Sequence, residues 1–192
     1  MLQLTPMKRL VFSTGNAEKF STAKQVCSQY GIELTQKKLN ITEIQEEDPK
    51  KVAEDKAAKA FVAAKQSIVI SDDSWSFLGL RGFPGIYMHS MNEWFKPEDF
   101  LRLTLTVEDR RVVLTQYLVY ADGNRQKIFR QQTKGLLLKE IRGVSEHPSH
   151  TLITMIGSKG LSIAETYEQS IDRSMQKTAN VWHDFAKWFN ES

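Results

Sequence analysis

The chain of 192 residues lacks the features that mark several specialised classes of protein. Cys27 is the single cysteine, so no disulfide can form within the chain, and this usage is typical of a reducing compartment. No apolar run approaches the roughly 18 residues that a membrane-spanning helix needs, and the N-terminal residues lack the long apolar stretch of a signal peptide. We therefore expect a cytoplasmic protein that does not associate with a membrane.

The chain also lacks a strong charge of either sign. Its net formal charge is +3, and its basic residues are scattered with no run of five or more, which argues against nucleic acid as a partner. Apolar residues make up 41% of the chain and charged residues 26%, a composition that supports a sizeable core. The length favours a single domain over residues 1–192.

The order of strand and helix patterns indicates the class of fold. Strand and helix patterns alternate over the first seventy residues, and Asp48 and Pro49 are expected as the N-cap and first residue of the second helix. Asp122-Gly123, between two strand patterns, is the strongest hairpin signal in the chain and adds antiparallel strands. We therefore predict an α/β fold with a mixed sheet. The predicted strands are 9–14, 32–40, 67–71, two within 111–135, and 151–157; the predicted helices are one that ends at Gly31, 49–65, 96–105 and one from about Ile171 onward.

Residues 13–19, with the sequence STGNAEK, follow the first predicted strand and open the first predicted helix. The free backbone N–H groups and the dipole at such a helix start favour an anion, and Gly15 lets the backbone approach a phosphate closely. Lys19 lies in the first turn, where a cation is disfavoured unless an anion is present. A plain strand-to-helix turn with Lys19 in solvent is an equally open interpretation, and the spacing does not match a Walker A loop.

The helix predicted over 49–65 carries a charge on its apolar side. On a helical wheel at about 100° per residue, Lys56 falls between Ala60 and Ala63 on the arc of valine, alanine and phenylalanine side chains. A charge in that position is costly unless it is paired or reaches a wet cleft. Lys56 is therefore either a functional residue or a lysine that extends from the edge of the face into solvent.

Two adjacent aspartates, Asp72 and Asp73, end the strand predicted before them, and Glu43 lies in the loop after another strand. Ligands of an open α/β sheet bind outside the carboxyl ends of its strands, so we expect these acids and residues 13–19 to face one cleft. Three carboxylates suit Mg²⁺ together with substrate phosphates. The alternative is that Asp72, Asp73 and Ser74 form a capped turn and that Glu43 is solvated.

Four stretches together resemble the inosine triphosphate pyrophosphatase family, the house-cleaning nucleoside triphosphate pyrophosphatases. They are FSTGNAEK (12–19), TEIQEEDPKKVAEDKAAKA (42–60), VISDDSW (69–75) and LRGFPGIY (80–87), in the family's order and at its spacing. The resemblance implies two lobes, a long twisted mixed sheet flanked by helices, an active cleft between the lobes, and a homodimer. It also implies Mg²⁺-dependent cleavage of a nucleoside triphosphate between its α and β phosphates, which yields a monophosphate and pyrophosphate.

The resemblance assigns roles to residues by their position. Asp73 resembles the acid that holds the metal or activates the attacking water, and Lys56 resembles a lysine on the family's second helix. The expected catalytic residues are Lys19, Lys56 and Asp73; the expected metal ligands are Glu43, Asp72 and Asp73; the expected substrate-binding residues are Thr14, Gly15, Asn16, Lys19, Lys56, Ser74 and Lys177.

The C-terminal third departs from the family's pattern. Residues 142–157 lack Phe, Tyr and Trp where the family has a glycine- and aromatic-rich loop. The family's lysine and Ser-His-Arg triplet are missing near Ile171 and residues 175–177. Because those elements hold the base in the family, the base preference stays open. Two alternatives therefore accompany the main interpretation: a catalytically silent homodimer that binds a nucleotide, and a pyrophosphatase that acts on another modified nucleotide.

Overall fold

The computed structural model describes residues 8–169 and 180–192, which divide into two compact units. Three strands run from one unit into the other, so the chain crosses between the units within regular secondary structure. A single domain over the whole chain stays a prediction, as does a cleft between lobes. Among the described residues, unit 1 contains 8–72, 116–131 and 180–192, and unit 2 contains 73–115 and 132–169.

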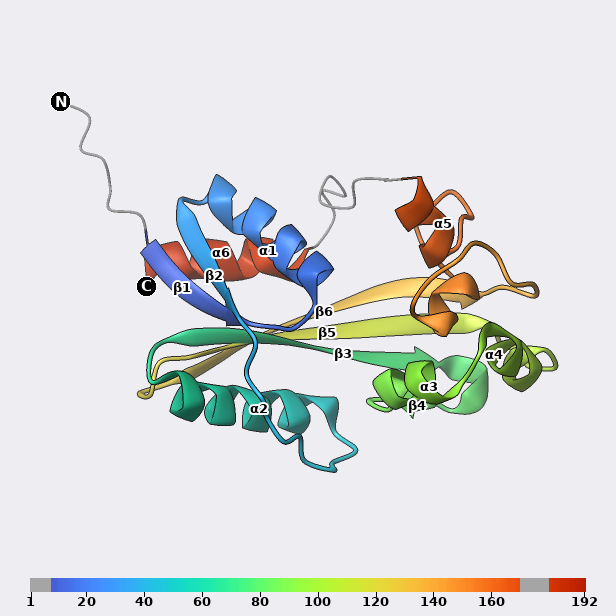
Figure 1. Cartoon of the computed structure of the whole chain (residues 1–192), viewed down its shortest axis with the longest axis horizontal. Helices are drawn as coiled ribbons and strands as arrows, with labels where there is room; N and C mark the ends of the chain where they lie inside the picture. Colours follow the sequence, from blue (N-terminus) through green and yellow to red (C-terminus); the bar gives the residue numbers. More distant parts are fainter. Residues whose placement is uncertain (1–7, 170–179) are drawn as a thin grey trace. The chain divides into compact units, whose positions relative to one another are not determined.

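The elements follow the predicted alternation of strands and helices (Figure 1). Unit 1 holds β1 (Lys8–Ser13), α1 (Ala17–Gln29), β2 (Ile32–Lys37), α2 (Pro49–Ala64) and α6 (Val181–Glu191). Unit 2 holds β4 (Pro84–Gly85), α3 (Met88–Trp94), α4 (Pro97–Thr104), β7 (Ile153–Met155), α5 (Ile163–Glu168) and two 3-10 turns, Leu78–Leu80 and Pro148–Thr151. The strands shared by both units are β3 (Ile68–Phe77), β5 (Arg111–Ala121) and β6 (Gln126–Leu137).

The strands form one mixed sheet. Their order is β2-β1-β3-β5-β6-β7, and the short β4 pairs with β3. β1 is parallel to both β2 and β3, whereas β4 is antiparallel to β3 and β7 is antiparallel to β6. The predicted α/β class, with a mixed sheet flanked by helices, is confirmed.

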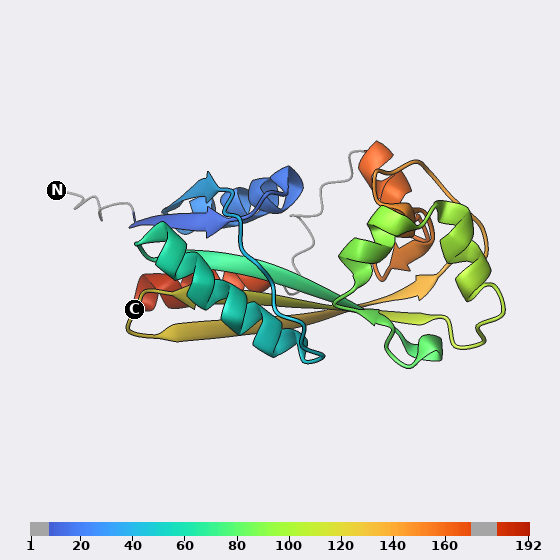
Figure 2. The same cartoon turned by 60° about the horizontal axis from the view of Figure 1, so that its bottom comes forward.

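Helices cover both faces of the sheet in unit 1. α1 and α6 lie on one face, and α2 lies on the other (Figure 1, Figure 2). Phe12 packs with Phe185 of α6 on the first face, while Ile68 and Ile70 pack against the alanines of α2 on the second. Val69, between these two isoleucines, packs on the first face because successive side chains of a strand alternate. Burial of both faces explains why residues 68–70 read as a continuous apolar run.

α2 begins where the sequence predicts. The Asp48 carboxylate accepts a hydrogen bond from the amide of Lys50 at 2.9 Å, and Pro49 occupies the first position of the helix. The helix ends at Ala64, and Lys65 closes it in the left-handed conformation with φ 54°. Its buried face consists mainly of alanines, which let the helix lie close to the strands. Lys56, which lies on the apolar side of α2, is therefore held near the sheet.

Unit 2 has a separate core. Its fully buried side chains include Phe77, Phe100, Val112 and Ile153. Two of its helices, α3 and α5, were not predicted from the sequence. Both are short, with seven and six residues, and isolated helices of that length are unstable in water. They depend on tertiary burial of side chains such as Met88, which the local pattern does not reveal.

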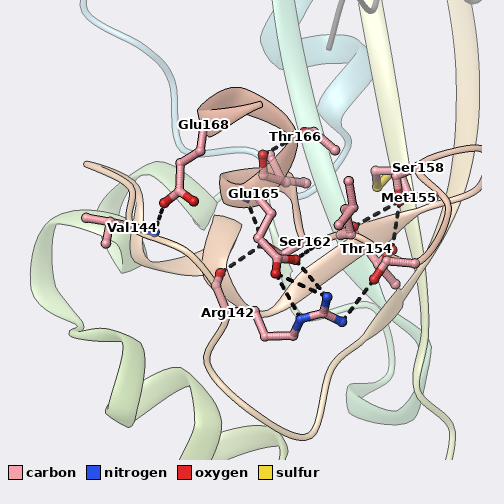
Figure 3. Close-up of polar contacts among 12 residues, drawn as sticks. Arg142, Val144, Thr154, Met155, Ser158, Ser162, Glu165, Thr166 and Glu168 are labelled. Atoms are coloured by element: carbon pink, nitrogen blue, oxygen red, sulfur yellow. Dashed lines mark hydrogen bonds and ion pairs between the residues drawn. The ribbon is translucent and has the colours of Figure 1, made fainter. Parts of the chain in front are cut away.

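A polar network in unit 2 joins Arg142 to the start of α5 (Figure 3). The Arg142 guanidinium donates two hydrogen bonds to Glu165, at 3.2 and 3.1 Å, and a third to the Gly160 carbonyl. Ser162 caps α5 by accepting from the Glu165 amide at 3.0 Å, and its hydroxyl donates to the Arg142 carbonyl at 2.8 Å. In return, the Glu165 carboxylate accepts from the Ser162 amide at 2.7 Å, which completes a capping box. We call these three residues, Arg142, Ser162 and Glu165, the arginine staple.

The prediction that a strand ends at Asp72 and Asp73 is wrong. β3 continues through both aspartates to Phe77. Its pairing with β1 does stop at Ile70, but beyond that point it pairs with β4 at Trp75. The apolar run therefore marks where β3 is covered on both faces, and not where its hydrogen bonding ends.

The C-terminal helix is confirmed as α6. Val181 and Phe185 are buried, and Trp188 and Phe189 pack against the same core as the predicted apolar stripe requires. The predicted start of this helix near Ile171 lies outside the described residues. Within residues 8–169 and 180–192, no helix has the length and apolar character that a bilayer crossing requires.

Candidate active site

Three neighbouring strands of unit 1 place their polar residues at one edge of the sheet. Ser13, the last residue of β1, lies opposite Lys37 on β2 and Ile70 on β3, and all three strands are parallel. The loop of residues 14–16 therefore leaves the sheet at the level of Lys37 and Ile70. Asp72 lies just beyond Ile70 on β3. This is the edge at which α/β sheets bind ligands.

The loop between β1 and α1 is fixed by hydrogen bonds of its own side chains. Thr14 Oγ1 accepts from the Asn16 amide at 3.1 Å, and Asn16 Oδ1 accepts from the Lys19 amide at 2.9 Å as the N-cap of α1. Gln36 of β2 donates its side-chain amide to the Thr14 carbonyl at 3.1 Å. Sequence reasoning missed Gln36, although its place near the end of the neighbouring predicted strand was the available signal.

The first turn of α1 offers backbone donors to an anion. The amides of Ala17 and Glu18 come before the first helical hydrogen bond, which runs from the Phe20 amide to the Asn16 carbonyl at 3.1 Å. Neither amide makes a hydrogen bond within the part of the chain that the structure describes. With the helix dipole, they favour a negatively charged group at this position.

Lys56, Glu43 and Asp72 form a compact charged cluster. The Lys56 Nζ lies 2.6 Å from Glu43 Oε1 and 3.1 Å from Asp72 Oδ1. The side chains of Lys56 and Asp72 are 22% and 17% exposed, whereas that of Glu43 is 51% exposed. The lysine on the apolar side of α2 is thus paired, as its position on the wheel required. We call these three residues the acid–lysine cluster.

Burial and charge pairing oppose each other in this cluster. Burial raises the pKa of Asp72 above its ordinary value, and the positive charge of Lys56 only partly opposes that effect. Burial would also lower the pKa of Lys56, but the nearby carboxylates of Asp72 and Glu43 outweigh it and raise that pKa. Lys19 lowers the pKa of Asp72 as well, so its charge acts on the cluster from α1. Two carboxylates share one close ammonium, so the cluster does not balance the charge of both acids when both are ionised.

Asp73 and Ser74 follow Asp72 along β3. By strand alternation, Asp72 points to the same face as Ile70, which packs against α2, and Asp73 points to the opposite face. The structure therefore joins Glu43 and Asp72 through Lys56, and it does not bring Asp73 to the same face. Ser74 is buried, with 5% of its surface exposed. The roles of Asp73 and Ser74 stay predictions.

A metal ion would find a partly formed site here. Among residues 8–169 and 180–192, no three His, Cys, Asp or Glu side chains are grouped closely enough to hold an ion. Glu43 and Asp72 nevertheless present hard carboxylate oxygens around one point, where the Lys56 ammonium now lies. Mg²⁺ typically takes one or two carboxylates and completes its coordination with substrate phosphates and water. This donor set fits Mg²⁺ on that basis.

The remaining candidates do not join this site. Lys177 lies outside the described residues. His147 precedes the 3-10 turn Pro148–Thr151 in unit 2 and His150 lies within it, with ring centroids 5.0 Å apart in an edge-to-face arrangement. Cys27 is fully buried on α1, and burial raises the pKa of its thiol to about 12, so it is not a nucleophile at neutral pH.

Comparison with known proteins shows which proteins this chain resembles. The model of the Ham1 family matches residues 10–169. A dITP/XTP pyrophosphatase of Methanosarcina acetivorans is 27% identical over 186 residues, which cover 95% of this chain and 98% of that protein. An inosine triphosphate pyrophosphatase of Yarrowia lipolytica is 30% identical over 117 residues, or 59% of this chain and 60% of that protein. A HAM1 protein from Coxiella burnetii has the same fold, with a TM-score of 0.73 at 14% identity over 97% of this chain and 100% of that one.

The resemblance noted in the sequence is thereby confirmed along most of the chain. Because the family model matches residues 10–169, which are most of the chain, the chain belongs to the Ham1 family.

Proposed function

We propose that the chain is a Mg²⁺-dependent pyrophosphatase that hydrolyses non-standard purine nucleoside triphosphates to monophosphate and pyrophosphate. The observation that carries this proposal is the acid–lysine cluster at the carboxyl edge of three parallel strands, next to the start of α1. The substrate class comes from the relatives, which are named dITP/XTP and inosine triphosphate pyrophosphatases.

The start of α1 would bind the polyphosphate. The amides of Ala17 and Glu18 and the side chain of Lys19 supply donors and positive charge there. The loop is held in place by Thr14, Asn16 and their hydrogen bonds, so little reorganisation is needed when substrate binds. Positioning of this kind accounts for most of the catalysis of phosphoryl transfer.

Glu43 and Asp72 would hold Mg²⁺, which when bound supplies positive charge to the phosphate oxygens. Lys56 keeps the two carboxylates close to each other before substrate arrives. Asp73 would orient a water molecule and accept its proton as the water oxygen bonds to the α phosphorus. The bond from that phosphorus to the bridging oxygen breaks, and pyrophosphate leaves with both electrons of the bond.

The proposal also includes a homodimer in the cytoplasm. Support for these two points is the family resemblance and, for the location, the composition with its single cysteine. Sedimentation equilibrium of the full chain would test the dimer, because a monomer mass at micromolar concentration would contradict it.

A panel assay tests the activity. The purified chain is incubated with inosine, xanthosine, guanosine, adenosine and pyrimidine triphosphates, with and without Mg²⁺, and pyrophosphate is measured. We expect release that requires the metal and is fastest for a non-standard purine. Binding of these nucleotides without any release would instead favour the catalytically silent alternative, and a preference for a pyrimidine would overturn the substrate class.

A further inference from the structure

Lys38 follows directly after β2 at the edge of the sheet where the candidate active site lies. Lys37, the last residue of β2, is the register partner of Ser13 on the neighbouring β1. Residue 38 and the loop of residues 14–16 therefore leave parallel strands at the same level. The hydrogen bond from Gln36 to the Thr14 carbonyl ties the two strand ends together.

The side chain of Lys38 lies along the loop at Gly15. A Cβ atom built on Gly15 would be 3.5 Å from both Cδ and Cε of Lys38, which is ordinary van der Waals contact. The aliphatic stem of the lysine thus packs beside the glycine, and its ammonium is attached at the end of that stem. Lys56, in contrast, belongs to another element, α2.

The charge of Lys38 is available to a ligand. Lys38 is exposed, and it makes no ion pair with a carboxylate within residues 8–169 and 180–192. In contrast, Lys56 is held by two carboxylates, and Lys59 is paired with Asp55 at 2.7 Å. An uncommitted ammonium that packs on an anion-binding loop adds positive charge where the polyphosphate would lie.

We propose that Lys38 is a further substrate-binding residue, whose ammonium contacts the polyphosphate of the substrate from the side of β2. This inference rests on the proposed function, because it assigns the loop of residues 14–16 to the phosphates. It adds a third lysine to Lys19 and Lys56 and gives the polyphosphate contacts from two neighbouring strand ends. The sequence showed a lysine pair at 37–38, but only the register and the contact with Gly15 single out the second of them.

The test compares Lys38→Gln with Lys37→Gln. Both variants remove one positive charge from adjacent exposed residues, so they change the net charge of the protein equally. Isothermal titration with inorganic tripolyphosphate and Mg²⁺ measures affinity, and steady-state kinetics with the best substrate of the panel measures KM and kcat. Far-ultraviolet circular dichroism confirms that each variant is folded.

We expect Lys38→Gln to weaken tripolyphosphate binding and raise KM by about tenfold, the size of one hydrogen bond to a charged group. Lys37→Gln should change either quantity by less than about twofold, and Lys38→Arg should restore most of the affinity. Equal effects of the two glutamine variants, or a larger effect of Lys37→Gln, would overturn the proposal.

Different results would contradict the proposed hydrolytic function and the proposed role of Lys38. If the wild type binds tripolyphosphate through Lys38 but releases no pyrophosphate from any nucleotide, the hydrolytic function fails and the role of Lys38 stands. If the wild type hydrolyses a nucleotide and Lys38→Gln matches Lys37→Gln, only the role of Lys38 fails. If the wild type does not bind tripolyphosphate at all, the role of Lys38 is refuted.

Discussion

The acid–lysine cluster of unit 1 and the arginine staple of unit 2 both place a basic side chain against carboxylate oxygens, yet the pKa shifts of their acids have opposite signs. In the first cluster, burial raises the pKa of Asp72 although a lysine lies 3.1 Å away. In the arginine staple (Figure 3), the Ser162 amide and then Arg142 lower the pKa of Glu165. The fold thus disfavours the ionised form of Asp72 and favours that of Glu165.

This difference in the pKa shifts of the two acids distinguishes the candidate active site from a contact that only stabilises the fold. The arginine staple pairs one acid with one base and satisfies the start of α5 with a capping box, so its charges need nothing more. The acid–lysine cluster groups two carboxylates around one ammonium in a partly buried place. The charged form of Lys56 is favoured there, but burial disfavours the ionised form of Asp72, and a bound cation would stabilise that carboxylate. Residues kept in an unfavourable state in this way are typical of functional sites.

The largest effect is expected for Asp72→Asn. The variant should lose turnover by about 10²- to 10³-fold, because the change removes the carboxylate that we propose as a metal ligand near the phosphates. Its thermal stability should stay the same or rise, because the ionised carboxylate is disfavoured by burial. Pyrophosphate release and thermal melts measure the two effects. Asp109→Asn, at a partly exposed carboxylate paired with Arg111 in unit 2, is the matched control and should keep its turnover.

Lys56→Gln should reduce both activity and stability. Loss of the ammonium leaves Glu43 and Asp72 facing each other without compensation, which should lower the free energy of unfolding by about 1–3 kcal/mol. Mg²⁺ at millimolar concentration should raise the melting temperature of this variant more than that of the wild type, because the ion replaces the missing charge. An equal response of the two proteins would contradict the assignment of Glu43 and Asp72 as ligands.

Ser162→Ala should reduce stability and leave activity unchanged. Ser162 is fully buried, and its hydroxyl caps α5 and donates to the Arg142 carbonyl. Loss of the cap should reduce the free energy of unfolding by about 1–2 kcal/mol, with kcat unchanged at a temperature where the variant is folded. Urea denaturation measures the free energy of unfolding. A large loss of kcat would mean that the arginine staple also serves the reaction.

The smallest effect concerns the pH dependence of Glu165. Because its folded-state pKa lies below the ordinary value of 4.5, its contribution to stability is present above that value and is lost as the pH falls through the lowered pKa. The difference in unfolding free energy between the wild type and Glu165→Gln should therefore shrink toward acid pH. Urea titrations across the acid range would test this, and a difference that grows toward acid pH would contradict the sign of the shift.

Local signals predicted the elements that frame the site. Asp48 and Pro49 marked the start of α2, and the periodicity placed its end within one residue of Ala64. The strand-to-helix turn at residues 13–19 was also correct, because capping and strand patterns depend on near neighbours in the chain. Whether β3 ends at Asp72 depends instead on hydrogen bonds to β4 and to β5, which lie elsewhere in the sequence. The prediction that the strand ends at Asp72 and Asp73 was wrong because a local sequence pattern does not show these pairings.

The sequence by itself determined that Lys56 lies on the apolar side of a helix and needs a partner, since helical periodicity is a property of adjacent turns. It also determined the family, through motifs in a fixed order. Only the tertiary structure decided which acids pair with this lysine, because Glu43 and Asp72 are 13 and 16 residues away and reach it from a loop and a strand. Strand alternation decided as well that Asp73 points away from Asp72, so adjacent residues in the sequence occupy opposite faces of the sheet.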